Sequence, residues 1–169
     1  DRVEEKQASR EATLKRLQGI KDERRKALAE KLVTKMCELP KKRAAELSRH
    51  LQTMTNVLAR VEEKSQGDAT VAAAVAMGTD AIAEAQTAVD AMSTGDCKVV
   101  ITGDDKKLGG EVSSSRLALA NQFKEAQAKV KTARKAVGEA IRALAKVLGE
   151  PVPKPVSETP APSPTPIHE

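Results

Sequence analysis

Few residues in this chain have reactive side chains, and the two cysteines are the most informative of them. Cys37 precedes Gly67 by 30 residues, and Cys97 follows Asp68 by 29 residues. If the intervening chain forms a helical hairpin that turns at Gly67 and Asp68, the two thiols arrive at the same level of its two arms. The spacing therefore predicts a Cys37–Cys97 disulfide, which implies an oxidising compartment and export. The alternative interpretation is two unrelated buried thiols.

The other reactive side chains do not form a catalytic or metal-binding pattern. The histidines are His50 and His168, and the sequence has no HExxH motif, phosphate-binding glycine loop or nucleophile elbow. Glu62-Glu63 is a pair of adjacent carboxylates, and neighbours on a helix point apart. Asp104-Asp105 lacks the alternating oxygen ligands and the closing Glu of a calcium loop, so a solvated turn is the better interpretation. We therefore expect no enzyme, no cofactor and no metal site.

A helical hairpin over residues 44–92 is the element that would position the cysteines. Apolar side chains recur along both of its arms at alternating spacings of three and four, as they do where one helix packs against another. Gly67 suits the left-handed end of the first arm, and Asp68 is a good N-cap for the second. The last helix continues the same spacing. The predicted helix-packing seam consists of Leu47, Leu51, Met54, Leu58, Val61, Val75, Ile82, Val89, Phe123, Val130, Val137 and Leu144.

Composition and periodicity together predict an all-α fold. Phe123 is the only aromatic residue and 31% of the residues are charged, which is typical of long helices and coiled coils. We expect an elongated antiparallel three-helix, coiled-coil-like bundle over residues 1–149. Its helices are expected at about 2–66, 69–94 and 112–148.

Three segments complicate this plan. Pro40 lies between two apolar stripes that are out of phase, so it either kinks the first helix or breaks it and makes a four-helix bundle; the cysteine spacing favours the kink. Residues 95–110 combine a β-branched run with the turn signals Gly103-Asp-Asp105 and Gly109-Gly110, which predicts an extended strap along the bundle. Residues 150–169 hold seven of the eight prolines and are expected to be a disordered Pro-rich tail or spacer rather than a PxxP ligand.

Charge is unevenly distributed along the chain. Residues 1–43 carry a balance of +6, residues 67–105 a balance of −6, and residues 111–149 a balance of +5. An acidic segment between two basic helices indicates intramolecular steering of helix pairing. Binding of nucleic acid or another anionic polymer is the less favoured alternative, because the chain lacks aromatic residues for base stacking and any recognised DNA-reading motif.

The start of the chain bears on its location. It begins at Asp1 rather than Met, and it has no apolar run approaching the roughly 20 residues that span a bilayer. We expect no transmembrane segment. We also expect export to the periplasm, cell surface or medium after removal of a signal peptide.

Two sequence segments and the Ala-rich helix between them carry a family resemblance. The segments are Leu51-Gln-Thr-Met-Thr-Asn-Val-Leu-Ala-Arg-Val-Glu-Glu63 and Lys131-Thr-Ala-Arg-Lys-Ala-Val-Gly-Glu-Ala-Ile-Arg-Ala-Leu-Ala145. Over roughly residues 44–148 the chain resembles the exported, Ala/Lys/Glu-rich helical proteins of candidate-phyla (patescibacterial) bacteria. That resemblance implies a cleaved signal peptide and a coiled-coil fold, and it implies no particular activity.

These observations predict a non-enzymatic structural or interaction protein of the cell envelope or surface. The expected role is that of a coiled-coil subunit that associates with itself or with another envelope protein. One alternative is an envelope holdase chaperone that grips unfolded clients on an apolar helical face. Another is a protein that binds nucleic acid or a different anionic polymer through its basic helices.

Overall fold

Helices account for every regular element in the part of the chain that the structure describes. The computed structural model describes residues 11–94, 99 and 101–151. Residues 11–17 are helical, α2 spans Glu23–Lys64, α3 spans Ala69–Thr94, and α4 spans Leu108–Leu148. The all-α class predicted from the sequence is therefore confirmed. Cys97, His168 and the Pro-rich tail beyond Pro151 lie outside the described residues.

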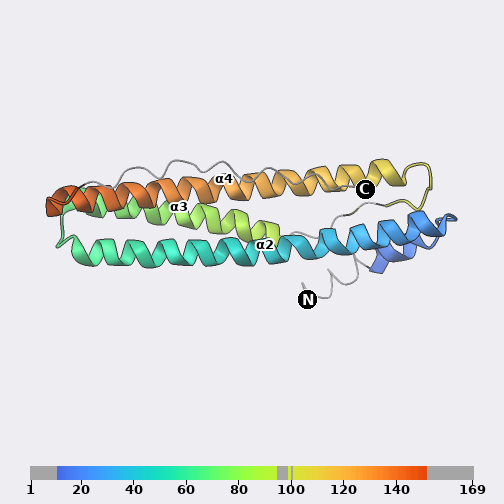
Figure 1. Cartoon of the computed structure of the whole chain (residues 1–169), viewed down its shortest axis with the longest axis horizontal. Coiled ribbons are helices and arrows are strands. Elements are labelled where there is room, and N and C mark those ends of the chain that lie inside the picture. The colour runs from blue at the N-terminus through green and yellow to red at the C-terminus, as the bar shows by residue number, and fades with distance from the viewer. Residues whose placement is uncertain (1–10, 95–98, 100, 152–169) are drawn as a thin grey trace.

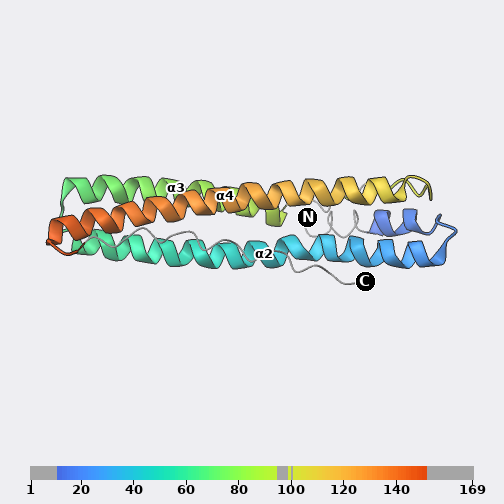
Figure 2. The same ribbon diagram turned by 45° about the horizontal axis from the view of Figure 1, so that its top comes forward.

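The long helices lie side by side in an elongated bundle (Figure 1). α2 and α4 begin at the same end of the bundle and run parallel, whereas α3 runs in the opposite direction (Figures 1 and 2). With 42 residues, α2 is about 63 Å long. The 26 residues of α3 accompany only part of that length, so the end of the bundle where α2 and α4 begin has no α3 beside it.

The turn between α2 and α3 forms where the sequence predicts it. Gly67 has a φ of +84°, in the left-handed region that glycine adopts without steric cost. The Oδ1 atom of Asp68 accepts the backbone N–H groups of Thr70 at 2.8 Å and Val71 at 3.0 Å, which satisfies two donors at the start of α3. Short-range chemistry alone accounts for this hairpin turn.

The first helical region differs from the expected single helix over residues 2–66. It is interrupted at residues 18–22, and α2 then runs through Pro40, so the predicted alternative of a break at that proline is wrong. The interruption has a local cause, because the Oδ1 atom of Asp22 accepts the backbone N–H groups of Arg24 and Arg25 at 3.0 and 3.1 Å and starts a new helix. Pro40 is buried within α2, where packing offsets the hydrogen bond that it cannot donate.

The segment expected to be an extended strap over residues 95–110 is shorter than predicted, because α4 begins at Leu108 rather than at residue 112. Gly109 and Gly110 lie inside the helix, so the turn predicted there is wrong. The other predicted turn, at Gly103-Asp-Asp105, is present: the backbone oxygen of Asp104 accepts the N–H groups of Lys107 and Leu108, and burial of Leu108 holds the first turn of α4 in place.

The described part of the strap, residue 99 and residues 101–107, is held by the helix at residues 11–17 and by α4. The backbone oxygen of Val99 accepts the hydroxyl of Thr13 at 3.4 Å. The hydroxyl of Thr102 donates to Oε1 of Glu111 at 2.6 Å, and the backbone N–H of Thr102 donates to Oε2 at 3.0 Å. The strap thus connects the helix at residues 11–17 to the start of α4, at the end of the bundle that α3 does not reach.

Three clusters of buried side chains follow one another along the bundle. The end cluster lies where α2 and α4 begin and contains Leu17, Ile20, Ala29, Val33, Val99, Ile101 and Leu108. The middle cluster contains Ala44, Leu51, Ala85, Val89, Met92, Ala126 and Ala133. The turn cluster, close to the α2–α3 turn, contains Leu58, Val61, Val71, Val75, Val137, Ala140 and Leu144.

Candidate interaction surfaces

The residues of the predicted helix-packing seam lie inside the bundle. All twelve are buried in the middle or turn cluster or pack against one of them as partly buried side chains. The helices approach closely beside the seam: a Cβ atom added to Gly78 of α3 would lie 2.9 Å from Cδ1 of the seam residue Leu58. The seam is therefore occupied within the chain, and surfaces for partners must be sought elsewhere.

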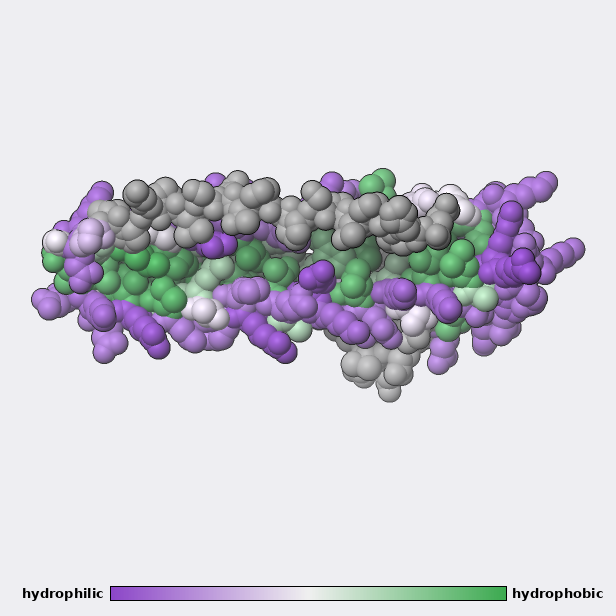
Figure 3. All heavy atoms as spheres, viewed as in Figure 1, coloured by the Kyte–Doolittle hydropathy of each residue, from purple (hydrophilic) through white to green (hydrophobic). Residues whose placement is uncertain are grey.

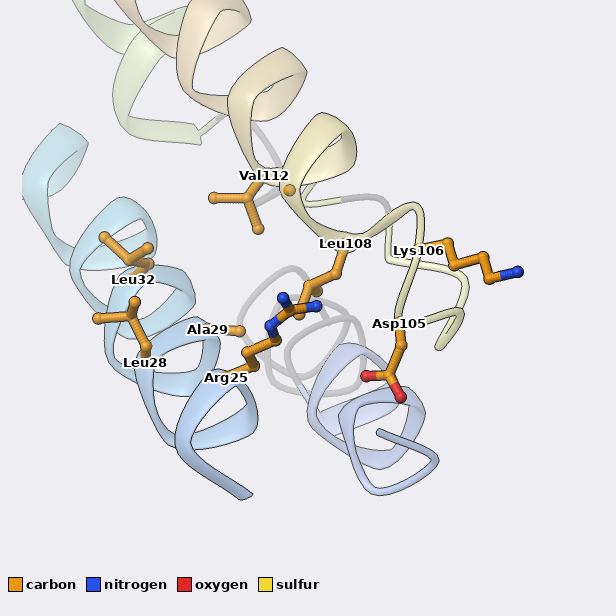
Figure 4. A pocket seen from close by; sticks show the side chains of 9 residues that line it. Arg25, Leu28, Ala29, Leu32, Asp105, Lys106, Leu108 and Val112 are labelled. Atoms are coloured by element: carbon orange, nitrogen blue, oxygen red, sulfur yellow. The ribbon is translucent and has the colours of Figure 1, made fainter. Parts of the chain in front are cut away.

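An apolar groove of about 380 Å³ opens between α2 and α4 at the end where α3 is absent (Figure 4). Leu28, Ala29 and Leu32 line it from α2, and Leu108 and Val112 line it from α4. Leu28 is 61% exposed although it is a large apolar residue. We call this groove the end groove. A space-filling view from the same side as Figure 1 shows a band of hydrophobic residues along the bundle, bordered by hydrophilic ones (Figure 3).

Positive charge predominates at the end groove. The guanidinium of Arg25 lies between the two helices in Figure 4, and Lys106 stands at the edge of the groove. Asp105 also lines the groove, but its carboxylate points toward the 18–22 segment, where Oδ2 accepts the backbone N–H of Lys21 at 3.4 Å. The Oδ1 atom of Asp105 is buried without a hydrogen-bond partner in the described part of the chain. Nε of Arg25 also lies 3.6 Å from Oδ2 of Asp22, in an ion pair exposed to solvent. The groove therefore offers a partner apolar groups, the solvent-exposed Arg25 with its paired carboxylate, and Lys106 at the edge.

The outward face of α3 is a second apolar surface, of a different kind. Met77 is 69% exposed, and it shares this face with exposed Ala73, Ala76 and Asp80, which follow the helical spacing of three and four. α3 has no lysine or arginine, and its three acidic residues are Asp80, Glu84 and Asp90. A helix that is apolar on most sides is normally covered on most sides. We call the exposed set Ala73, Ala76, Met77 and Asp80 the α3 face.

One ion pair joins the acidic helix to a basic one. Nζ of Lys129 in α4 lies 2.8 Å from Oε2 of Glu84 in α3. The hydrogen bond from Lys129, followed by its charge, lowers the pKa of Glu84, and the same two interactions with Glu84 raise the pKa of Lys129. Both groups are exposed to solvent, so the pair favours the observed helix pairing only weakly.

The other residues singled out by the sequence do not come together. His50 and the Glu62-Glu63 pair are exposed on α2, and Cys37 is partly buried against the end cluster. The Oδ1 atom of Asp104 accepts the backbone N–H of Lys106 at 2.9 Å, a contact within the turn. Among the described residues, no group of three or more His, Cys, Asp or Glu side chains is placed to hold a metal ion. Within the same ranges, no helix is long and apolar enough to cross a membrane.

Neither surface was predicted from the sequence. The signal for the end groove was present in the spacing of four between Leu28 and Leu32, two apolar residues of one helix. The signal for the α3 face was an Ala-rich helix with no basic residue.

Comparison with known proteins found no matching family model, no similar curated protein and no matching solved structure.

Proposed function

We propose that this chain is a non-enzymatic structural protein, a coiled-coil subunit that associates with copies of itself in the cell envelope or at the cell surface. The observation that carries the proposal is the α3 face. An exposed methionine among exposed alanines, on a helix packed on its other side, is the kind of surface that a further helix covers. The elongated shape of the bundle suits a subunit of an extended assembly.

Sedimentation velocity of the full chain under non-reducing conditions tests the proposal. We expect the mean mass to rise with protein concentration, because apolar surface is removed from water on association. A single monomeric species over the whole concentration range would contradict self-association.

Export and a Cys37–Cys97 disulfide belong to the same proposal. Cys37 packs against the end cluster, and Val99, only two residues after Cys97, is a member of that cluster. This contact between Cys37 and the cluster that contains Val99 supports the proposed pairing. A free-thiol titration of the unfolded, non-reduced protein should find no thiol. Two free thiols per chain would contradict both the disulfide and the argument for export.

The outward face of α2 favours a second candidate function, binding of an anionic polymer. Exposed basic residues recur on the side of α2 opposite its buried face, at spacings of seven and four: Arg24, Lys31, Lys35, Lys42 and Arg49. Such a stripe would contact successive phosphates or sulfates. Binding to a labelled single-stranded oligonucleotide that weakens steeply as salt rises would support this function. No binding at low salt would rule it out.

A further inference from the structure

We infer that the end groove of one copy receives the α3 face of a second copy. This inference rests on the self-association proposed above and identifies the two surfaces that would meet. Each surface is apolar at its centre and exposed to solvent, and the two carry opposite charges. A second copy of this chain is therefore an occupant whose chemistry fits the groove.

The two surfaces have complementary shapes, because one is concave and the other has a projecting side chain. The end groove is concave and lined by Leu28, Leu32 and Val112. On the α3 face, Met77 projects beside Ala73 and Ala76, whose short side chains let another surface approach the helix closely. A methionine side chain is flexible enough to fill an irregular apolar space. Met77 is thus the residue that would enter the groove.

The charges of the two surfaces are also complementary. The α3 face includes Asp80, and α3 as a whole has acidic residues and no basic ones. The end groove has Arg25 between its walls and Lys106 at its edge. Two copies of the α3 face would repel each other through Asp80, and so would two copies of the groove through Arg25. Opposite charges therefore favour pairing of the α3 face with the groove over pairing of either surface with itself.

The two surfaces lie far apart on one copy. Met77 lies in the first third of α3, near the α2–α3 turn, whereas the end groove lies at the opposite end of the bundle. One copy can therefore use its groove and its α3 face at the same time. An interface between two different surfaces does not end at a dimer unless a ring closes, so it generates chains of subunits.

Two substitutions of exposed residues test the two surfaces one at a time. Leu28→Glu places an anion in the groove, and Met77→Lys places a cation on the α3 face, so each surface then repels its partner. A matched control is Leu117→Glu, because Leu117 is 63% exposed on α4 and does not line the groove. All three positions are solvent-exposed, so the variants should keep the helical circular dichroism and the unfolding midpoint of the wild type.

Sedimentation velocity of the single variants and of their mixture tests the inference. Leu28→Glu and Met77→Lys should each weaken association by about tenfold or more, whereas Leu117→Glu should associate like the wild type. An equimolar mixture of Leu28→Glu and Met77→Lys should associate more strongly than either variant alone. The first variant retains its α3 face and the second retains its groove, and the altered groove and altered α3 face carry opposite charges.

Each other outcome would overturn the inference, and the outcomes differ in what they leave standing. If the wild type associates and both variants associate equally well, self-association stands but uses other surfaces. If Met77→Lys abolishes association, Leu28→Glu does not, and the mixture does not restore association, the α3 face pairs with itself. If the wild type is monomeric at every concentration, the inference and the proposed self-association both fail, which leaves the groove to an unfolded client or another ligand.

Discussion

Leu58 of α2 packs against the backbone of α3 at Gly78, so closely that a Cβ atom on Gly78 would lie 2.9 Å from Cδ1 of Leu58. Leu58 is itself buried in the turn cluster. The absence of a side chain at Gly78 is therefore what lets the two helices approach here. Small residues serve the same purpose elsewhere in the core, which contains many alanines and no buried tryptophan or tyrosine.

This contact predicts that Gly78→Leu destabilises the bundle. The new side chain overfills the space against Leu58, and we expect the free energy of unfolding to fall by about 1–3 kcal/mol. Urea unfolding followed by circular dichroism measures the change. Ala83→Leu is the control, because Ala83 is exposed on the same helix and should change stability little. Combining Gly78→Leu with Leu58→Ala should cost less than the sum of the two single changes; strict additivity would contradict the proposed contact.

We expect replacement by alanine to have opposite effects on stability at Gly103 and at Gly109. Gly103 has a φ of +88°, and a Cβ atom there would lie 2.9 Å from the backbone oxygen of Arg16, so Gly103→Ala should destabilise the protein by about 1–2 kcal/mol. Gly109 lies in α4 with nothing within 4 Å of an added Cβ, so Gly109→Ala should stabilise it by about 0.5–1 kcal/mol. Thermal unfolding of the two variants in parallel measures both signs. A stabilising Gly103→Ala would mean that the turn does not need its left-handed backbone.

The Lys129–Glu84 pair predicts a defined pH dependence. The pKa of Glu84 is lowered from its ordinary value of 4.5, so its contribution to stability is present above pH 4.5 and is lost as the pH falls through the folded-state pKa. The pKa of Lys129 is raised from 10.5, so its contribution is present below that pH and is lost as the pH rises through the folded-state value. In Glu84→Gln the acid-side loss should be smaller than in the wild type. Glu46→Gln, which removes a charge paired within α2, is the matched control.

The proposed Cys37–Cys97 disulfide predicts that reduction destabilises the protein. The bond would close a loop of 59 intervening residues, and the chain-entropy model gives a loss of about 4 kcal/mol when it is removed. Urea unfolding with and without a thiol reductant measures this change. A Cys37→Ser and Cys97→Ser double variant should match the reduced protein and should not respond to the reductant. An equal unfolding midpoint for the oxidised and reduced wild type would contradict the bond.

The sequence predicted the features that depend on near neighbours along the chain. The apolar spacing of three and four placed the seam residues, and Gly67 with Asp68 marked the turn into α3. These signals suffice because the identity of a helix face and of a cap is set within about one or two helical turns. The N-cap at Asp22 was equally readable, but the helical pattern around it concealed the signal.

Only the tertiary structure decided where α4 begins and which apolar residues remain exposed. Val99 and Ile101 join Leu17 in the end cluster across more than 80 residues of sequence, and that contact fixes the strap and the start of α4. Leu28 lies four residues before the half-buried Leu32, yet it stays exposed at the end groove, at a level of the bundle that α3 does not reach. The sequence determines which side chains share a helix face, whereas the lengths of the helices packed together determine which of those faces are covered.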